Sequence, residues 1–204
     1  MAARYRKRGL DKTSRQMVEF LADQGIEGAS VLEVGGGVGE IQIELLKRGA
    51  GRSVNLELSS AYDDEAGRLL REAGFEDRVE RRLHDIAADP DSIEPVDVVV
   101  LHRVVCCYPD YERLLGAAAA HARHALVFSY PPRNAPSRLV IAVENLGCRL
   151  MRREFRAFAH PPSAMLEVLR DRGLAPTFVH KGFAWQVTGL ARSPREIGQA
   201  AARI

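Results

Sequence analysis

The sequence predicts an α/β fold built on a doubly wound, mostly parallel sheet that ends in an antiparallel hairpin. Apolar strand-like runs alternate with amphipathic segments along most of the 204 residues, which is the pattern of a parallel sheet with crossover helices. Near the end, the stretch 177–192 reads as two strands separated only by Lys181-Gly182, which is typical of a hairpin. Between the first strand-like run and the next helix, glycine fills four of the five positions 35–39.

The elements follow from apolar periodicity and from the residues that begin and end helices. Strands are expected at 30–34, 53–58, 79–84, 95–102 and 125–130, before the hairpin. Helices are expected at about 13–25, 39–48, 60–73, 111–121 and 163–172, most of them ended by a glycine. Thr13 and Gln16 fit a capping box at the first helix. The run 95–102 is apolar almost throughout, so we expect a central strand that is buried on both faces.

Size and composition indicate one soluble domain. The length allows one substantial core, and 29 basic against 27 acidic residues give a formal charge of only +2, which does not favour nucleic acid as a partner. No apolar run is long enough to span a membrane, and Cys106, Cys107 and Cys148 form no CxxC pair. We therefore predict a cytoplasmic protein, a monomer or homodimer. Its expected parts are a basic segment and helix at 1–27, a domain at 28–192 with an insertion at 131–160, and a tail at 193–204.

The glycine-rich stretch VLEVGGGVGE at 31–40 indicates a ligand that approaches the backbone closely. A phosphate-binding P-loop needs a lysine directly after its last glycine, and the next lysine here is Lys47. A dinucleotide fingerprint would place its third glycine where Glu40 stands, and a carboxylate there repels pyrophosphate. NAD is therefore disfavoured without being excluded. A nucleoside with a positive centre and no phosphate, such as S-adenosylmethionine, fits better.

Acidic residues at neighbouring strand ends support this interpretation. Glu33 precedes the glycines and can face an ammonium group directly or through water. Glu57 ends the second strand and can accept hydrogen bonds from two ribose hydroxyls. Asp85 ends the third strand and can accept from an adenine amino group beside the apolar Ile86. The alternatives are an ordinary tight turn at the glycines, a solvated Glu57, and an Asp85 that only caps a helix.

These motifs resemble those of the Rossmann-like S-adenosylmethionine-dependent methyltransferases, over about residues 28–191. The resemblance implies a seven-stranded sheet, S-adenosylmethionine as cofactor and S-adenosylhomocysteine as product. It places the glycines at the methionine portion and Glu57 at the ribose. The expected cofactor-binding residues are Glu33, Gly35, Gly36, Gly37, Gly39, Glu57, Leu58, Asp85, Ile86 and His102.

The acceptor side is expected after the fourth and fifth strands. His102 stands at a strand end and is the candidate catalytic base, although a structural histidine would fit equally well. Tyr108, Tyr130 and Arg133 are candidate substrate-binding residues. Cys106 and Cys107 have apolar neighbours and are expected to pack rather than react. No metal site is expected.

For two further segments, the sequence leaves two possible roles each. The arginines of 131–160 could bind an anionic acceptor or could form the solvated face of a helix. The N-terminal RYRKRGLDK could cover the cofactor, with Tyr5 over it, or could be a loose tail.

The runs VLHRVVCCYPDYERLL, LVFSYPPRN and REFRAF are similar to magnesium-protoporphyrin O-methyltransferases, although Cys107 stands where those enzymes have a histidine. The function expected is methyl transfer to an oxygen of a small molecule, with a carboxylate of a porphyrin-like molecule as one candidate. The alternatives are an RNA or protein methyltransferase, or a non-catalytic module that binds S-adenosylmethionine.

Overall fold

The computed structural model describes residues 1–192, and the predicted tail at 193–204 lies outside the described residues. A seven-stranded sheet has the order β3-β2-β1-β4-β5-β7-β6. Its strands are β1 Ser30–Val34, β2 Arg52–Glu57, β3 Val79–Leu83, β4 Val96–Leu101, β5 Ala122–Tyr130, β6 Leu174–Lys181 and β7 Gln186–Arg192. The first five strands are parallel, and β7 runs antiparallel to both of its neighbours. The predicted fold class is confirmed.

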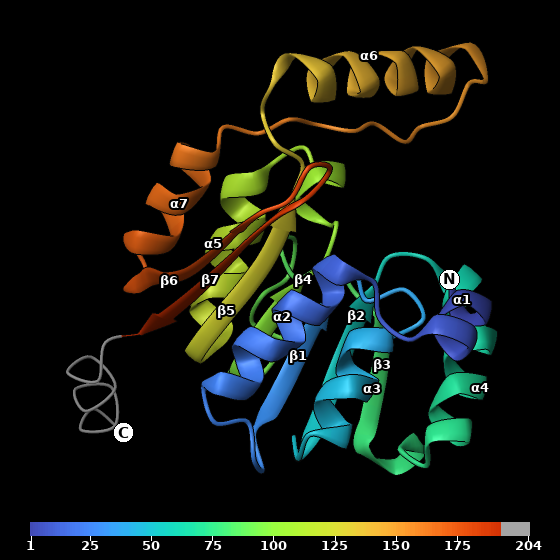
Figure 1. The fold of residues 1–204 in the computed structure, drawn as a ribbon, viewed down its shortest axis with the longest axis vertical. Coiled ribbons are helices and arrows are strands. Elements are labelled where there is room, and N and C mark those ends of the chain that lie inside the picture. The colour runs from blue at the N-terminus through green and yellow to red at the C-terminus, as the bar shows by residue number, and fades with distance from the viewer. Residues whose placement is uncertain (193–204) are drawn as a thin grey trace.

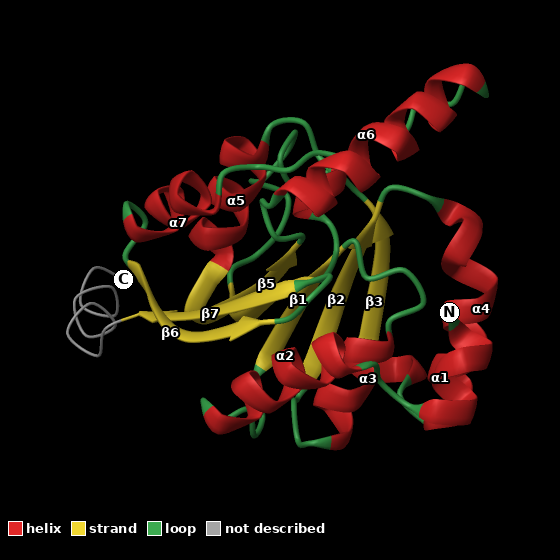
Figure 2. Ribbon diagram, turned by 45° about the horizontal axis from the view of Figure 1, so that its top comes forward, coloured by secondary structure: helices red, strands yellow, loops and turns green. Residues whose placement is uncertain are grey.

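Helices cover both faces of this sheet. They are α1 Ala2–Arg8, α2 Lys12–Asp23, α3 Glu40–Lys47, α4 Asp63–Ala73, α5 Tyr111–His121, α6 Ala135–Leu150 and α7 Pro162–Arg170. Helices α2 and α3 lie on one face, and α5 and α7 lie on the other (Figures 1 and 2). Among residues 1–192, no helix is long and apolar enough to cross a membrane.

The core lies on both faces of the central strands, because successive side chains of a strand point in opposite directions. Val31, Val98 and Val100 pack with residues of α2 and α3. Leu32 and Val99 pack with residues of α5 and α7 on the opposite face. This double burial holds β1 and β4 rigidly side by side, and their carboxyl ends carry the candidate site.

The N-terminal segment is helical and anchored. Arg6 donates to Glu65 and to Glu72 of α4, so the alternative of a loose tail is wrong. The predicted capping box is also wrong: α2 begins at Lys12, and its N-cap is Asp11, whose side chain accepts a hydrogen bond from the Ser14 N–H at 2.8 Å. A carboxylate two residues before Thr13 thus satisfies one of the free N–H groups of the first turn.

Residues 131–160, where the sequence predicts an insertion, consist of α6 and an extended return segment. It lies beyond the carboxyl ends of the strands (Figure 1). Asn134 caps α6 by accepting from the Ser137 N–H at 2.9 Å. The first strand of the hairpin is longer than predicted, because β6 begins at Leu174 and continues through Lys181. The turn consists of residues 182–185 and not of Lys181-Gly182 as predicted.

Candidate active site

The candidate site lies where the order of the strands reverses. β1 and β4 are neighbours in register, with Val34 opposite Leu101, so Gly35 and His102 emerge side by side. Ligands of open α/β sheets bind at this kind of position. A cavity of about 490 Å³ opens here, which we call the glycine-side cavity. Most of the predicted cofactor-binding residues line it, namely Gly35, Gly37, Glu57, Leu58, Asp85, Ile86 and His102.

The glycine turn is shaped by left-handed backbone angles and is braced by Glu57. Gly35 and Gly37 have φ of 63° and 56°, which residues with a side chain rarely adopt. The Glu57 carboxylate accepts from the Gly37 N–H at 2.9 Å and from the Leu58 N–H at 2.8 Å. A Cβ on Gly37 would meet no atom within 4 Å, so this position opens onto the cavity.

These features fit a nucleoside cofactor. Each carboxylate oxygen of Glu57 accepts one backbone N–H and has capacity for another donor. A pair of ribose hydroxyls is the donor set that such a carboxylate can hold. The turn leaves room for close approach at Gly37, and its own residues 35–39 include no lysine or arginine that would indicate a phosphate. Arg81 donates to the Gly37 carbonyl oxygen at 3.1 Å and pairs with Asp63. The chemistry of the wall is therefore consistent with S-adenosylmethionine.

At the end of the cavity where adenine is expected, Asp85 lies against Tyr108. One Asp85 oxygen accepts from the Ala87 N–H at 2.9 Å, and the other accepts from the Tyr108 hydroxyl at 2.9 Å. Ile86 is buried beside them. Tyr108 was predicted on the substrate side, but it lines the glycine-side cavity, where its hydroxyl orients Asp85.

Glu33, Gly36 and Gly39 do not line the cavity. Glu33 is 2% exposed and lies behind the glycine turn, where it accepts from the Gln42 N–H at 3.2 Å. A Cβ on Gly36 would clash with the side chains of Glu33 and Asn55. Burial raises the pKa of Glu33 to about 8, and the nearby Glu40 adds to this shift. Glu33 therefore supports the turn from inside the protein.

The raised pKa of Glu33 predicts a pH-dependent stability. Between its ordinary value of 4.5 and about 8, the unfolded carboxyl is ionised while the folded one keeps its proton. Unfolding then releases a proton, so the free energy of unfolding falls as pH rises, by at most about 1.4 kcal/mol per pH unit. Glu33→Gln removes this group, and urea denaturation between pH 5 and 8 should show a flatter profile for the variant. Parallel profiles for the two proteins would contradict the assignment.

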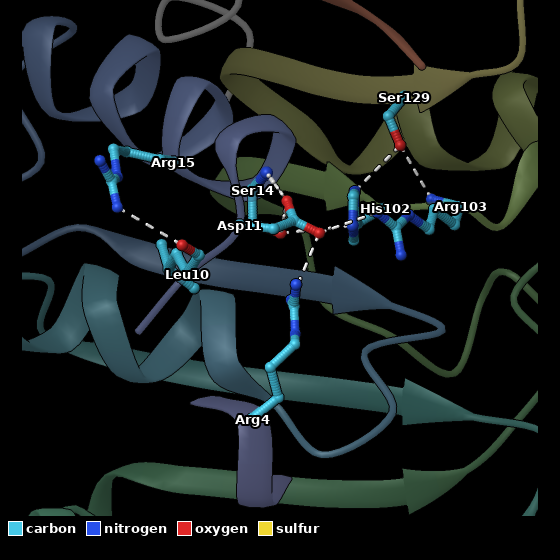
Figure 3. Close-up of polar contacts among 8 residues, drawn as sticks. All are labelled: Arg4, Leu10, Asp11, Ser14, Arg15, His102, Arg103 and Ser129. Atoms are coloured by element: carbon cyan, nitrogen blue, oxygen red, sulfur yellow. Dashed lines mark hydrogen bonds and ion pairs between the residues drawn. The ribbon is translucent and has the colours of Figure 1, made fainter. Parts of the chain in front are cut away.

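His102 is held in a polar network that joins the N-terminal helices to the end of β4 (Figure 3). Its Nδ1 lies 3.0 Å from the Ser129 hydroxyl, and its Nε2 lies 3.3 Å from the Ser14 hydroxyl. Burial lowers its pKa to about 4; the Arg103 charge acts in the same direction, and Asp11 opposes it. His102 is therefore neutral at physiological pH, and both ring nitrogens have hydroxyl partners. This environment suits a positioning role better than that of a strong base.

Arg103 is a site residue that the sequence reasoning missed. It has a left-handed φ of 59°, and backbone strain of this kind is concentrated at functional sites. Its guanidinium pairs with Asp11 at 2.8 Å and lies over the Trp185 ring, with its centre 5.0 Å from the ring centroid. The one signal in the sequence was the position of Arg103 directly after His102, at the end of a predicted strand. Its partners Asp11 and Trp185 lie far away in the sequence, so no local pattern indicated them.

A second cavity of about 500 Å³ adjoins the first, beneath α6. We call it the α6-side cavity. Its wall is mainly apolar and includes Val140, Ile141 and Trp185. Glu144 is the one carboxylate among the described residues that line it. The two cavities share Arg103, Cys107 and Phe155 as lining residues.

Two of the predicted substrate residues lie elsewhere. Tyr130 is buried in the core, and its hydroxyl lies 3.1 Å from that of Thr188. Arg133 is exposed and lines neither cavity. The other arginines of 131–160 do not line the α6-side cavity either. Over the described range 1–192, no three His, Cys, Asp or Glu residues are grouped to hold a metal ion.

Comparisons with known proteins agree with this geometry. Solved structures of similar fold include a magnesium protoporphyrin IX methyltransferase from Synechocystis PCC 6803 with bound S-adenosylhomocysteine. It is 20% identical, with a TM-score of 0.73 over 89% of this chain and 83% of that one. A geranyl diphosphate methyltransferase in complex with S-adenosylmethionine is 18% identical, with a TM-score of 0.66 over 88% and 85%. An O-methyltransferase family protein from Burkholderia thailandensis is 21% identical, with a TM-score of 0.69 over 88% and 56%.

No curated protein matches the chain in sequence. The methyltransferase domain family, in contrast, matches residues 3–179, which is most of the chain. The predicted enzyme class is confirmed, and the neighbours that hold S-adenosylmethionine or its product agree with the predicted cofactor. The chain belongs to the methyltransferase domain family.

Proposed function

We propose that the protein transfers the methyl group of S-adenosylmethionine to an oxygen of a small, mainly apolar molecule. When bound, this cofactor supplies an electrophilic methyl group on a sulfonium. The protein has to hold the two reactants in line, since such a displacement depends mostly on alignment. Glu57, Asp85 and the glycine turn would hold the cofactor, and the α6-side cavity would hold the acceptor.

The observation that carries the proposal is the shared wall of the two cavities. Arg103, Cys107 and Phe155 line both, so ligands in the two cavities would meet at these residues. An acceptor large enough to fill about 500 Å³ is of drug-like size. A concave, mainly apolar cavity of this size favours a small molecule over RNA or a protein segment as the acceptor.

The chemistry of the wall limits the acceptor further. A carboxylate acceptor needs no base, and Arg103 is the cation at the junction of the cavities that could orient it. A hydroxyl acceptor would need a proton acceptor. Glu144, on the α6 side, is the candidate for that role, because both ring nitrogens of His102 already have hydroxyl partners. A porphyrin-like carboxylate is one candidate among apolar acids, and the Synechocystis neighbour is by its name a magnesium protoporphyrin IX methyltransferase.

The test is the transfer of labelled methyl from S-adenosylmethionine into a cell extract that is then divided into organic-soluble, protein and RNA fractions. We expect the label in the organic-soluble fraction. Ile141→Trp, which fills the α6-side cavity, should reduce transfer at least tenfold while leaving the affinity for S-adenosylhomocysteine unchanged. Leu83→Trp, at an exposed position outside both cavities, is the matched control and should change neither.

Two outcomes would overturn the proposal. Label that is removed by ribonuclease or that precipitates with protein would establish a macromolecular acceptor. Micromolar binding of S-adenosylhomocysteine without transfer to any fraction would instead indicate a non-catalytic binding module.

A further inference from the structure

Helix α6 has an apolar stripe that faces away from the protein. Leu139, Val143, Leu146 and Leu150 are 57% to 75% exposed, and their spacing puts them on one side of the helix. The opposite side carries Cys148, which is buried, and Ile141, which lines the α6-side cavity. A helix of a globular protein normally turns its apolar stripe to the core, so an outward stripe of this size indicates an interaction surface.

Positive charge accompanies this stripe. Arg138 and Arg149 are about three turns apart and therefore lie on the same flank of α6. Both are exposed, and Arg152 and Arg153 follow directly after the helix end. The one acid within α6 is Glu144, which lines the cavity on the other side. Beyond the helix, Glu154 is an acid next to Arg153. The outward surface thus combines apolar side chains with an excess of arginines over acids.

We propose that the outward face of α6 docks on an anionic lipid bilayer. A helix with an apolar face and flanking arginines lies in the plane of a membrane surface, with its apolar side chains among the lipid chains and its cations at the head groups. The stripe supplies the first part of this pattern and the arginines supply the second. Figure 1 shows α6 beyond the carboxyl ends of the strands, at the outside of the molecule, where a flat surface can reach it.

A second copy of the chain fits this surface less well. Pairing of two α6 stripes in the antiparallel sense would bring the Arg138 and Arg149 flanks of the two copies against each other, because equal flanks face one another in such a pair. No acid of α6 lies on that flank to offset the repulsion. An anionic bilayer, by contrast, gains from each of these arginines.

The docking face is continuous with the entrance of the α6-side cavity. Val140 and Phe183 line that cavity and are 64% and 96% exposed. An apolar acceptor dissolved in the bilayer would therefore reach the cavity along apolar side chains. This consequence rests on the proposed function, whereas the docking itself does not.

The test is co-sedimentation of the full chain with vesicles of phosphatidylcholine alone and of phosphatidylcholine mixed with phosphatidylglycerol. We expect binding to the anionic vesicles. Arg149→Ala should weaken it about fivefold, the contribution of one arginine near a charged surface. The double variant Val143→Glu and Leu146→Glu should weaken it at least about tenfold. Val179→Glu, at an exposed apolar position of β6, is the matched control and should bind like the wild type.

Melting temperature and calorimetric affinity for S-adenosylhomocysteine are measured on every variant, and both should be unchanged. Vesicle binding by a protein that fails to bind S-adenosylhomocysteine would support the docking surface and refute the proposed function. The docking proposal fails if the wild type does not bind anionic vesicles. It fails also if the double variant co-sediments with these vesicles as strongly as the wild type does. It also fails if light scattering shows a dimer that only the double variant disrupts, since the surface would then be an interface between copies.

Discussion

Replacing Glu57 by alanine is expected to weaken the binding of S-adenosylhomocysteine about 100-fold, or about 2.7 kcal/mol. The carboxylate braces the glycine turn through the Gly37 N–H and is the acceptor that we assign to the ribose hydroxyls. Alanine removes both functions and leaves the Gly37 N–H without its partner. Calorimetric titration of the purified variant measures the effect, and circular dichroism verifies that the variant is folded.

Two variants separate this effect from a general change of charge. Glu57→Gln keeps the shape but replaces one acceptor oxygen by a donor, so it should lose about tenfold. Glu80→Ala removes a carboxylate of the neighbouring strand that pairs with Arg82 and lines neither of the two cavities, and its affinity should match that of the wild type. A folded Glu57→Ala protein with wild-type affinity would refute the assignment of Glu57.

Replacing Gly35 by alanine is expected to lower the free energy of unfolding by about 2 to 5 kcal/mol. The left-handed φ of 63° costs a residue with a side chain about 1 to 2 kcal/mol. The new Cβ would also lie 2.5 Å from a Val104 methyl, and such overpacking costs about 1 to 3 kcal/mol. Urea denaturation measures the sum.

Gly37→Ala is the matched comparison. Its φ of 56° is equally left-handed, but its Cβ would meet no atom within 4 Å. It should therefore lose only about 1 to 2 kcal/mol of stability, while cofactor affinity falls because the new methyl enters the glycine-side cavity. Adding Val104→Ala to Gly35→Ala should recover the overpacking part alone. Equal losses of stability for Gly35→Ala and Gly37→Ala would show that contact with Val104 contributes nothing.

The fold and much of the wall around the glycine turn could be predicted because they depend on local patterns. Apolar alternation fixes the strands, and residues at the ends of neighbouring parallel strands meet at one edge of a sheet. Gly35, Glu57, Asp85 and His102 each stand at such an end, and all of them line one cavity. Glu33 does not, because its strand is buried on both faces and its side chain points behind the turn.

The remainder depends on contacts between segments that local patterns do not relate. Tyr130 was predicted at the substrate, yet its neighbour Ser129 is the residue that reaches His102, because adjacent side chains of a strand point to opposite faces. The α6-side cavity joins α6 to the hairpin turn at Trp185, and no periodicity links those two segments. The predicted N-cap Thr13 was wrong, and the actual N-cap Asp11 also takes part in a distant contact. One oxygen of Asp11 accepts from the Ser14 N–H of α2, and the other accepts from the Arg103 guanidinium.

The network of Figure 3 has a consequence for the order in which the protein acquires its shape. Asp11 and Arg103 are separated by 92 positions, and Ser14 and His102 by 88. Contacts of such high sequence separation form late, because a long stretch of chain must be ordered first. During synthesis, the first helices have to wait until β4 and β5 have emerged before this wall can close. Affinity for the cofactor should therefore arise at the end of folding. Binding of S-adenosylhomocysteine would then indicate that the tertiary structure is complete, whereas helical content measured alone would not.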